Sequence, residues 1–109
     1  MSETDSHNRA KNKAAGKNGQ TEVPLAGNRR LDALTAGKGR ATEVERSGNN
    51  EMLEKAAKRL KASGAPQKVL QVPHSDMDAA ANAMRKARVL GTVKNLGGTK
   101  SRSVKPKGR

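Results

Sequence analysis

Apolar and polar residues alternate along this chain with two different periods, and the period separates predicted strands from predicted helices. In residues 29–35 and 41–46 the apolar positions fall roughly every second residue, as in a strand with one buried face. The sequence Ala-Gly-Lys-Gly at 36–39 lies between them, so the two segments are predicted to form a hairpin. Residues 50–63 instead have apolar positions three and four apart, which predicts a helix that Gly64 ends.

The same criteria predict three more strands and a second long helix. Residues 68–73 and 92–96 are short apolar segments, and residues 21–26 contain Pro24, which confines a strand to the edge of a sheet. Residues 75–90 have a helical apolar pattern, with Ser75 as the predicted cap. The strand–helix–strand unit at the end predicts parallel pairing through a crossover.

These elements predict an α/β fold, a small mixed β-sheet in the order strand, strand, strand, helix, strand, helix, strand, with helices packed on it. We divide the chain into three parts. Residues 1–18 are a flexible polar and basic arm with one short helix around 8–15. Residues 19–96 are the folded domain, and residues 97–109 are a basic tail that is predicted to be disordered.

The net charge of the chain indicates what kind of partner it binds. The chain has 23 Lys and Arg against 10 Asp and Glu, a net charge of +13 in 109 residues. Such an excess favours polyanions, because each neutralised phosphate releases a condensed counterion. We therefore expect nucleic acid as the partner, and no membrane, because no basic segment has the large apolar face of an interfacial helix.

Missing residue types exclude several kinds of site. Without Phe, Tyr or Trp, the chain cannot stack bases on aromatic side chains. Without Cys it has no disulfide, thiolate zinc site or cysteine nucleophile, and His7 and His74 lack metal-ligand spacing. The N-terminus has no apolar segment typical of a signal peptide, so a cytoplasmic protein is expected, with delivery as a toxin module left open.

Three acidic residues in the predicted hairpin are candidate metal ligands and catalytic groups: Asp32, Glu43 and Glu45. Glu43 and Glu45 are two apart and so share one face of a strand. A four-residue loop places Asp32 across from Glu43, with Cβ atoms ~4.5–5.5 Å apart. Such carboxylates repel unless a cation lies between them, and Mg²⁺ (or Mn²⁺) held there could activate water toward a phosphodiester. The alternative is that these acids pair with arginines on a solvated face.

Basic residues crowd the same hairpin and continue in the tail, where they are candidate phosphate contacts. They are Arg29, Arg30, Lys38, Arg40 and Arg46 in the hairpin, and Lys100, Arg102, Lys105, Lys107 and Arg109 in the tail.

Three short segments resemble the core of PD-(D/E)xK nucleases. They are Gly-Gln-Thr-Glu-Val-Pro-Leu (19–25), Arg-Arg-Leu-Asp-Ala-Leu-Thr (29–35) and Ala-Thr-Glu-Val-Glu-Arg-Ser-Gly (41–48). The likeness covers about residues 19–75 and is nearest to Holliday-junction-resolvase-like enzymes and to the small nuclease modules of bacterial polymorphic toxins. In that family an Asp on one strand and an E-x-K motif on the next hold the metal, which implies these roles for Asp32 and Glu43. Resolvases tend to dimerise, which leaves a homodimer open for this chain.

Two positions depart from the family pattern. The residue before Asp32 is Leu31 where the family has Pro, and the lysine position is Glu45. Arg46 follows, but it should face the other side of the strand. Glu45 is thus either a third metal ligand or a degenerate lysine position, and Glu22 is a candidate accessory acid.

The sequence leaves three functions of different classes open. The first is a metal-dependent DNA endonuclease or a degenerate relative of one, with DNA favoured over RNA. The second is a non-catalytic basic protein that binds DNA or RNA, and an accessory protein that binds an acidic protein surface is a third. The three acidic residues favour the nuclease, because a protein that only binds nucleic acid has no use for carboxylates placed opposite one another in its most basic hairpin.

Overall fold

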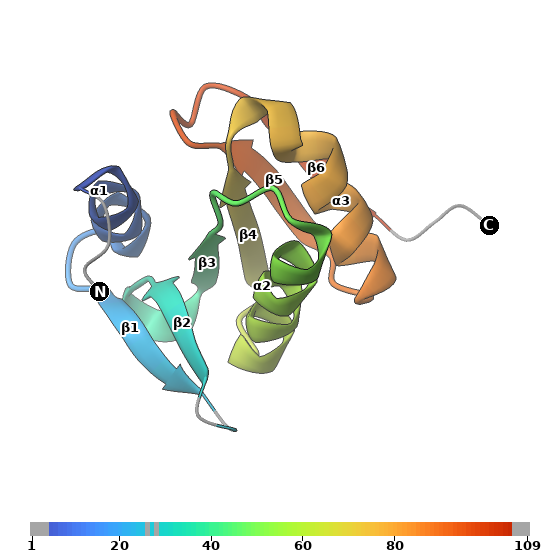
Figure 1. Cartoon of the computed structure of the whole chain (residues 1–109). Helices are drawn as coiled ribbons and strands as arrows, with labels where there is room; N and C mark the ends of the chain where they lie inside the picture. The colour runs from blue at the N-terminus through green and yellow to red at the C-terminus, as the bar shows by residue number, and fades with distance from the viewer. Residues whose placement is uncertain (1–4, 26, 28, 106–109) are drawn as a thin grey trace.

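The computed structural model describes residues 5–25, 27 and 29–105. Within these residues there are three α-helices: α1 (Asp5–Ala15), α2 (Asn50–Ser63) and α3 (Met77–Lys86). The six strands are β1 (Gln20–Leu25), β2 (Arg29–Leu34), β3 (Arg40–Val44), β4 (Gln67–Val72), β5 (Gly91–Asn95) and β6 (Ser101–Val104). Figure 1 shows them as one sheet with helices against it. None of the described helices is both long and apolar enough to cross a membrane.

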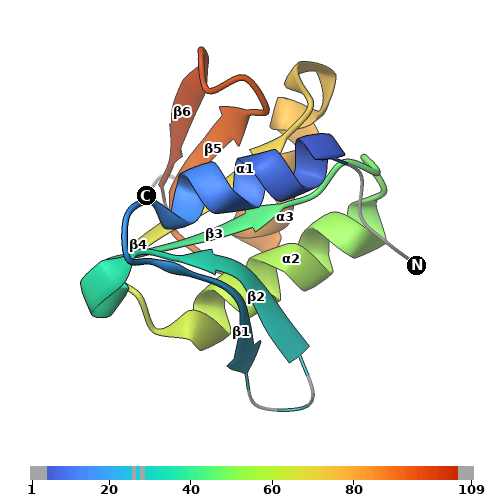
Figure 2. The ribbon, with the colours of Figure 1, turned by 90° about the vertical axis from the view of Figure 1, so that its left-hand side faces the viewer.

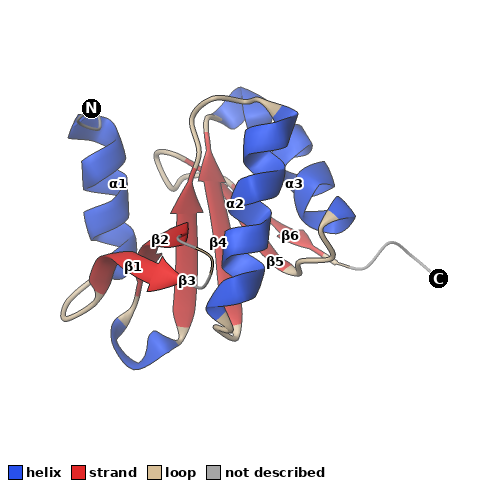
Figure 3. Ribbon diagram, turned by 60° about the horizontal axis from the view of Figure 1, so that its bottom comes forward, coloured by secondary structure: helices blue, strands red, loops and turns tan. Residues whose placement is uncertain are grey.

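The strands follow one another across the sheet in chain order, from β1 to β6. β3, β4 and β5 pair in parallel, and the remaining neighbours pair antiparallel. Parallel neighbours need a crossover, which α2 supplies between β3 and β4 and α3 between β4 and β5. Both connections step across the sheet in the same direction, from β3 to β4 and from β4 to β5. Because they also have the same handedness, α2 and α3 lie on one face of the sheet, where Figure 3 shows them side by side. The predicted α/β class with a mixed sheet is confirmed.

The two faces of the sheet are covered unequally. α2 and α3 bury their apolar residues against the sheet, with Ala41, Leu70, Val72 and Val93 in the shared core. Across the sheet, α1 lies over part of the opposite face (Figure 2). We refer to these as the packed face and the open face. The asymmetry leaves much of the open face without a helix.

Both ends contain more structure than their composition predicts. Asp5–Ala15 of the predicted flexible arm is helical, and Ala15 is buried. In the predicted tail, Ser101–Val104 forms β6 and pairs with β5, with Val104 buried. The side chain of Asn95 accepts hydrogen bonds from the N–H groups of Thr99 and Lys100, which closes the turn between these strands. The fold thus gains a strand over the predicted order, the helix of the arm extends to Asp5 from the predicted 8–15, and the expected disorder does not apply to residues 101–104.

Candidate functional site

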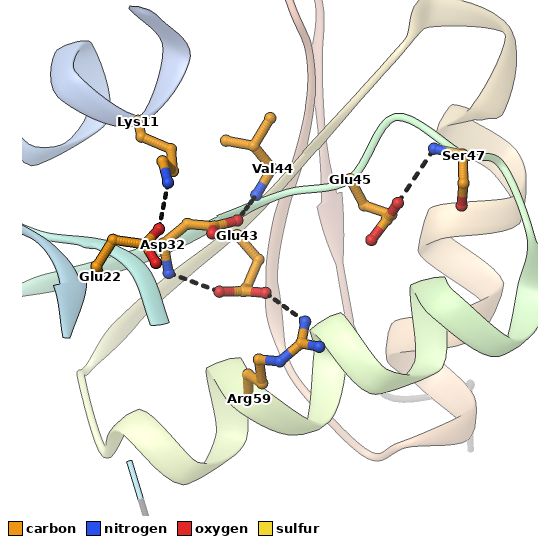
Figure 4. A network of polar contacts seen from close by, with 8 residues as sticks. All are labelled: Lys11, Glu22, Asp32, Glu43, Val44, Glu45, Ser47 and Arg59. Carbon is orange, nitrogen blue, oxygen red and sulfur yellow. Dashed lines mark hydrogen bonds and ion pairs between the residues drawn. The ribbon is translucent and has the colours of Figure 1, made fainter. Parts of the chain in front are cut away.

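Asp32 and Glu43 lie where β2 and β3 stop pairing. The last paired residues are Ala33 with Thr42, so continuing the register places Asp32 across from Glu43. Here the carboxylates of Asp32 and Glu43 accept hydrogen bonds from backbone N–H groups, where a regular sheet would use backbone carbonyls, as Figure 4 shows. The Asp32 N–H donates to Oε2 of Glu43 over 2.7 Å, and the Val44 N–H donates to Oδ2 of Asp32 over 2.8 Å. Each carboxylate is therefore held by the backbone of the opposite strand.

Glu43 is the most buried acid of this site, with 2% of its surface exposed. On the packed face, Arg59 of α2 donates from Nη1 to Oε1 of Glu43 over 2.9 Å. Burial raises the pKa of Glu43, and so does the negative charge of Asp32, while the Asp32 N–H and Arg59 lower it, for a value of about 8. Burial and the Asp32 charge thus favour the protonated form of Glu43, and Arg59 opposes them.

Glu45 does not join this pair. Glu45 follows the last residue of β3, Val44, and its N–H still donates to the Gln71 carbonyl over 2.9 Å. Its carboxylate instead accepts a hydrogen bond from the N–H of Ser47 over 3.1 Å, pointing away from Asp32 in Figure 4. The structure thus brings Asp32 and Glu43 together and leaves Glu45 apart from them. Among the residues that the structure describes, no group of three His, Cys, Asp or Glu could hold a metal ion.

A third acid does lie level with Asp32, on the other side of it. Thr21 and Val23 of β1 pair with Ala33 and Leu31, which places Glu22 beside Asp32 in the neighbouring strand. Glu22 has a left-handed backbone with a φ of 55°, a conformation that costs an ordinary residue about 1 kcal/mol. Glu22, Asp32 and Glu43 thus form a row across three strands, which we call the acid row.

Two cations that the sequence reasoning missed hold the ends of the acid row. Lys11 of α1, only 4% exposed, forms an ion pair with Glu22, and Arg59 pairs with Glu43. The position of Arg59 could have been found from the sequence, because it lies next to Leu60 at the border of the apolar stripe of α2. Lys11 had none, since its segment lacks an apolar pattern and its partner lies 11 positions along the chain.

The basic residues of the hairpin do not form one patch. Arg29 and Arg30 begin β2, whereas Lys38 and Arg40 lie at the turn, roughly 17 Å away at the rise of a strand. Arg40 donates from Nε to Oε1 of Gln67 over 3.1 Å. Arg46 is exposed in the loop that follows β3.

The predicted tail contacts are also divided. Lys100 and Lys105 are exposed, while Arg102 forms an ion pair with Asp78 of α3. Lys107 and Arg109 lie outside the described residues.

The donor chemistry of Asp32 and Glu43 fits a hard divalent cation. Mg²⁺ takes oxygen ligands, and one or two carboxylates with several waters are a usual set. Asp32 and Glu43, two carboxylates on adjacent strands, match that set in donor type and number. Comparisons of the chain with protein-family models, with curated proteins and with solved structures return no match.

Proposed function

We propose that this chain is a metal-dependent nuclease that acts on DNA. The observation that carries the proposal is the Asp32–Glu43 pair, two carboxylates held by each other's strands where β2 and β3 separate. Acids that merely pair with arginines on a surface are solvated and weakly held. Glu43 is buried, and its two oxygens accept separate hydrogen bonds, so its position is fixed as a ligand site requires.

In this proposal Asp32 and Glu43 hold Mg²⁺ (or Mn²⁺), which when bound lowers the pKa of a water and polarises the phosphate. Lys11, the buried ammonium of α1 that pairs with Glu22 at the open-face end of the acid row, is our candidate for the part that an E-x-K lysine would have had, because Glu45 bonds Ser47 instead. Its charge would stabilise negative charge that develops on the phosphate. A homodimer is part of the proposal, since a resolvase-like enzyme cuts two strands.

Matched charge-neutral variants test this function. Asp32→Asn and Glu43→Gln should each abolish cleavage of plasmid and junction DNA in Mg²⁺ or Mn²⁺, with DNA binding kept. Glu45→Gln removes the same charge two residues from Glu43 and should leave cleavage near wild type, because its side chain faces away. Metal should raise the melting temperature of the wild type and of Glu45→Gln, but not of the other two variants.

One observation favours the second function, a non-catalytic basic protein that binds DNA or RNA. Arg59 already neutralises Glu43, so this pair could serve the fold alone. A wild type that binds nucleic acid, cleaves no DNA or RNA and gains no stability from Mg²⁺ or Mn²⁺ would establish this function and refute the nuclease.

A further inference from the structure

The open face of the sheet has a groove beside α1. It consists of two adjoining hollows of about 280 Å³ and about 330 Å³, which share Arg40, Val69 and Lys94. The first lies between α1 and the turn at Gly97 and Gly98, and the second runs along the starts of β4 and β5. The shared residues make the two hollows one continuous depression across β3, β4 and β5.

Residue alternation separates this groove from the acid row. Thr42 and Val69 line the groove, while their chain neighbours Glu43 and Leu70 point to the packed face, toward Arg59 and the core. α1 itself contributes Lys13 to the groove (Figure 2 shows this helix over the open face). The groove is thus a second site, on the other side of the sheet from Glu43.

The charge of the groove has one sign. The cations that face it are Lys13, Arg40 and Lys94, while the ammonium of Lys68, the neighbour of Val69, donates to the Ala65 carbonyl; as far as the described residues go no acid lines either hollow. Lys13 and Lys94 were not among the predicted phosphate contacts. Polar Thr42 and Gln71 form part of the floor, and the exposed backbone of Gly97 and Gly98 has open space where side chains would stand. A strand of phosphates could approach both side chains and backbone here.

We propose that this basic groove binds the sugar-phosphate backbone of a nucleic acid strand. The proposal rests on the proposed function in taking nucleic acid as the ligand, and it adds a path for the strand that the hairpin arginines do not supply. Charge complementarity selects the occupant, because several cations in line with no acid among them match a polymer of regularly spaced phosphates. Without aromatic residues, the groove contacts the backbone and not the bases, so binding is independent of sequence.

A pair of charge-matched double variants tests the groove. Lys13→Gln/Lys94→Gln removes two charges from it, and Lys58→Gln/Lys61→Gln removes two from exposed positions of α2. Binding of labelled single-stranded and duplex oligonucleotides is measured by fluorescence anisotropy over a range of salt, with EDTA present to prevent cleavage. The groove variant should lower the slope of log affinity against log salt by roughly 2, equally for all sequences. The α2 variant should keep the wild-type slope.

Cross-linking locates the strand directly, because the chain has no cysteine of its own. Thr92→Cys places a photoreactive label in the second hollow, and Ala62→Cys places it on exposed α2. Oligonucleotide should cross-link to position 92 and not to position 62.

Five outcomes overturn the inference. Equal loss of binding in both double variants, or equal cross-linking at both positions, would mean diffuse attraction with no groove. A groove variant that binds like the wild type would remove the groove but leave nucleic-acid binding standing. A wild type that binds no oligonucleotide would remove the proposed function as well. Tighter binding of polyglutamate than of oligonucleotide would make an acidic protein the occupant.

Discussion

The two faces of the sheet treat charge in opposite ways. On the packed face Glu43 is withdrawn from water, and its position depends on hydrogen bonds from the Asp32 N–H and from Arg59. On the open face Lys13 and Lys94 line a groove in contact with solvent, with no acid in its lining among the described residues. A buried charge is costly unless it is paired, whereas a solvated charge costs little. Changes on the packed face should therefore alter stability and pH response, and changes on the open face should alter binding and salt response.

The largest expected change in the free energy of unfolding comes from an alanine substitution on β4, where two neighbouring residues can be compared. Leu70 is fully buried in the core of the packed face, while Val69, which lines the groove, is 5% exposed and lies outside that core. Leu70→Ala should lower the free energy of unfolding by about 3 kcal/mol through lost burial and a cavity, and Val69→Ala, which removes two carbons in place of three and opens onto the groove, by about 1.5 kcal/mol. Urea unfolding measures both. Equal losses would show that the open face is packed as tightly as the other, and the comparison of the faces would fail.

Removing Arg59 should give the next largest effect, and it should depend on pH. The pKa of Glu43 is raised from 4.5 to about 8, so the folded state binds this proton more tightly than the unfolded state. The contribution of Glu43 to stability is thus full below about pH 4.5 and is lost as the pH rises through 8. In Arg59→Leu the pKa of Glu43 rises further, because Arg59 lowers it. The variant should lose roughly 2–3 kcal/mol in mildly alkaline buffer and much less in mildly acidic buffer.

The double variant Arg59→Leu/Glu43→Gln is the control for this pH effect. With no ionisable group left at position 43, most of the lost stability should return at alkaline pH. Urea unfolding of wild type, single and double variants at several pH values gives the comparison. A loss in Arg59→Leu that is the same at every pH would mean that Arg59 contributes packing and not charge.

Elements with complete local signals could be predicted from the sequence. Helix α2 spans Asn50–Ser63 as predicted, because its apolar spacing, early acid and terminal Gly64 agree, and Gly64 has the left-handed φ of 71° that such an end requires. The loop length of the hairpin also predicted the register that brings Asp32 to Glu43. Both predictions depend on residues close together in the chain.

Features that depend on distant neighbours could not be predicted. The carboxylate of Glu45 accepts a hydrogen bond from the Ser47 N–H in the loop after β3, a contact that the alternation of the strand does not predict. β6 buries one side chain, Val104, and owes its existence to backbone pairing with β5, which no apolar pattern reveals. α3 begins at Met77 after a short 3₁₀ turn, so Ser75 is not its cap.

The smallest expected effect on stability concerns Lys11, whose ion pair can be compared with that of Arg59. The carboxylate of Glu22 is 44% exposed, whereas that of Glu43 is 2% exposed. Water can therefore solvate Glu22 when its partner is removed, and Lys11→Met, which keeps an unbranched apolar stem, should cost only about 1 kcal/mol in urea unfolding. If Lys11 also stabilises phosphate charge, the same variant should lose DNA cleavage while it remains folded and still binds DNA. Lys17→Met, an exposed lysine just after α1, should change neither property. A Lys11→Met protein that cleaves like the wild type would leave Lys11 a structural role only, and a loss of stability as large as that of Arg59→Leu would show that exposure of the partner does not decide the strength of these two ion pairs.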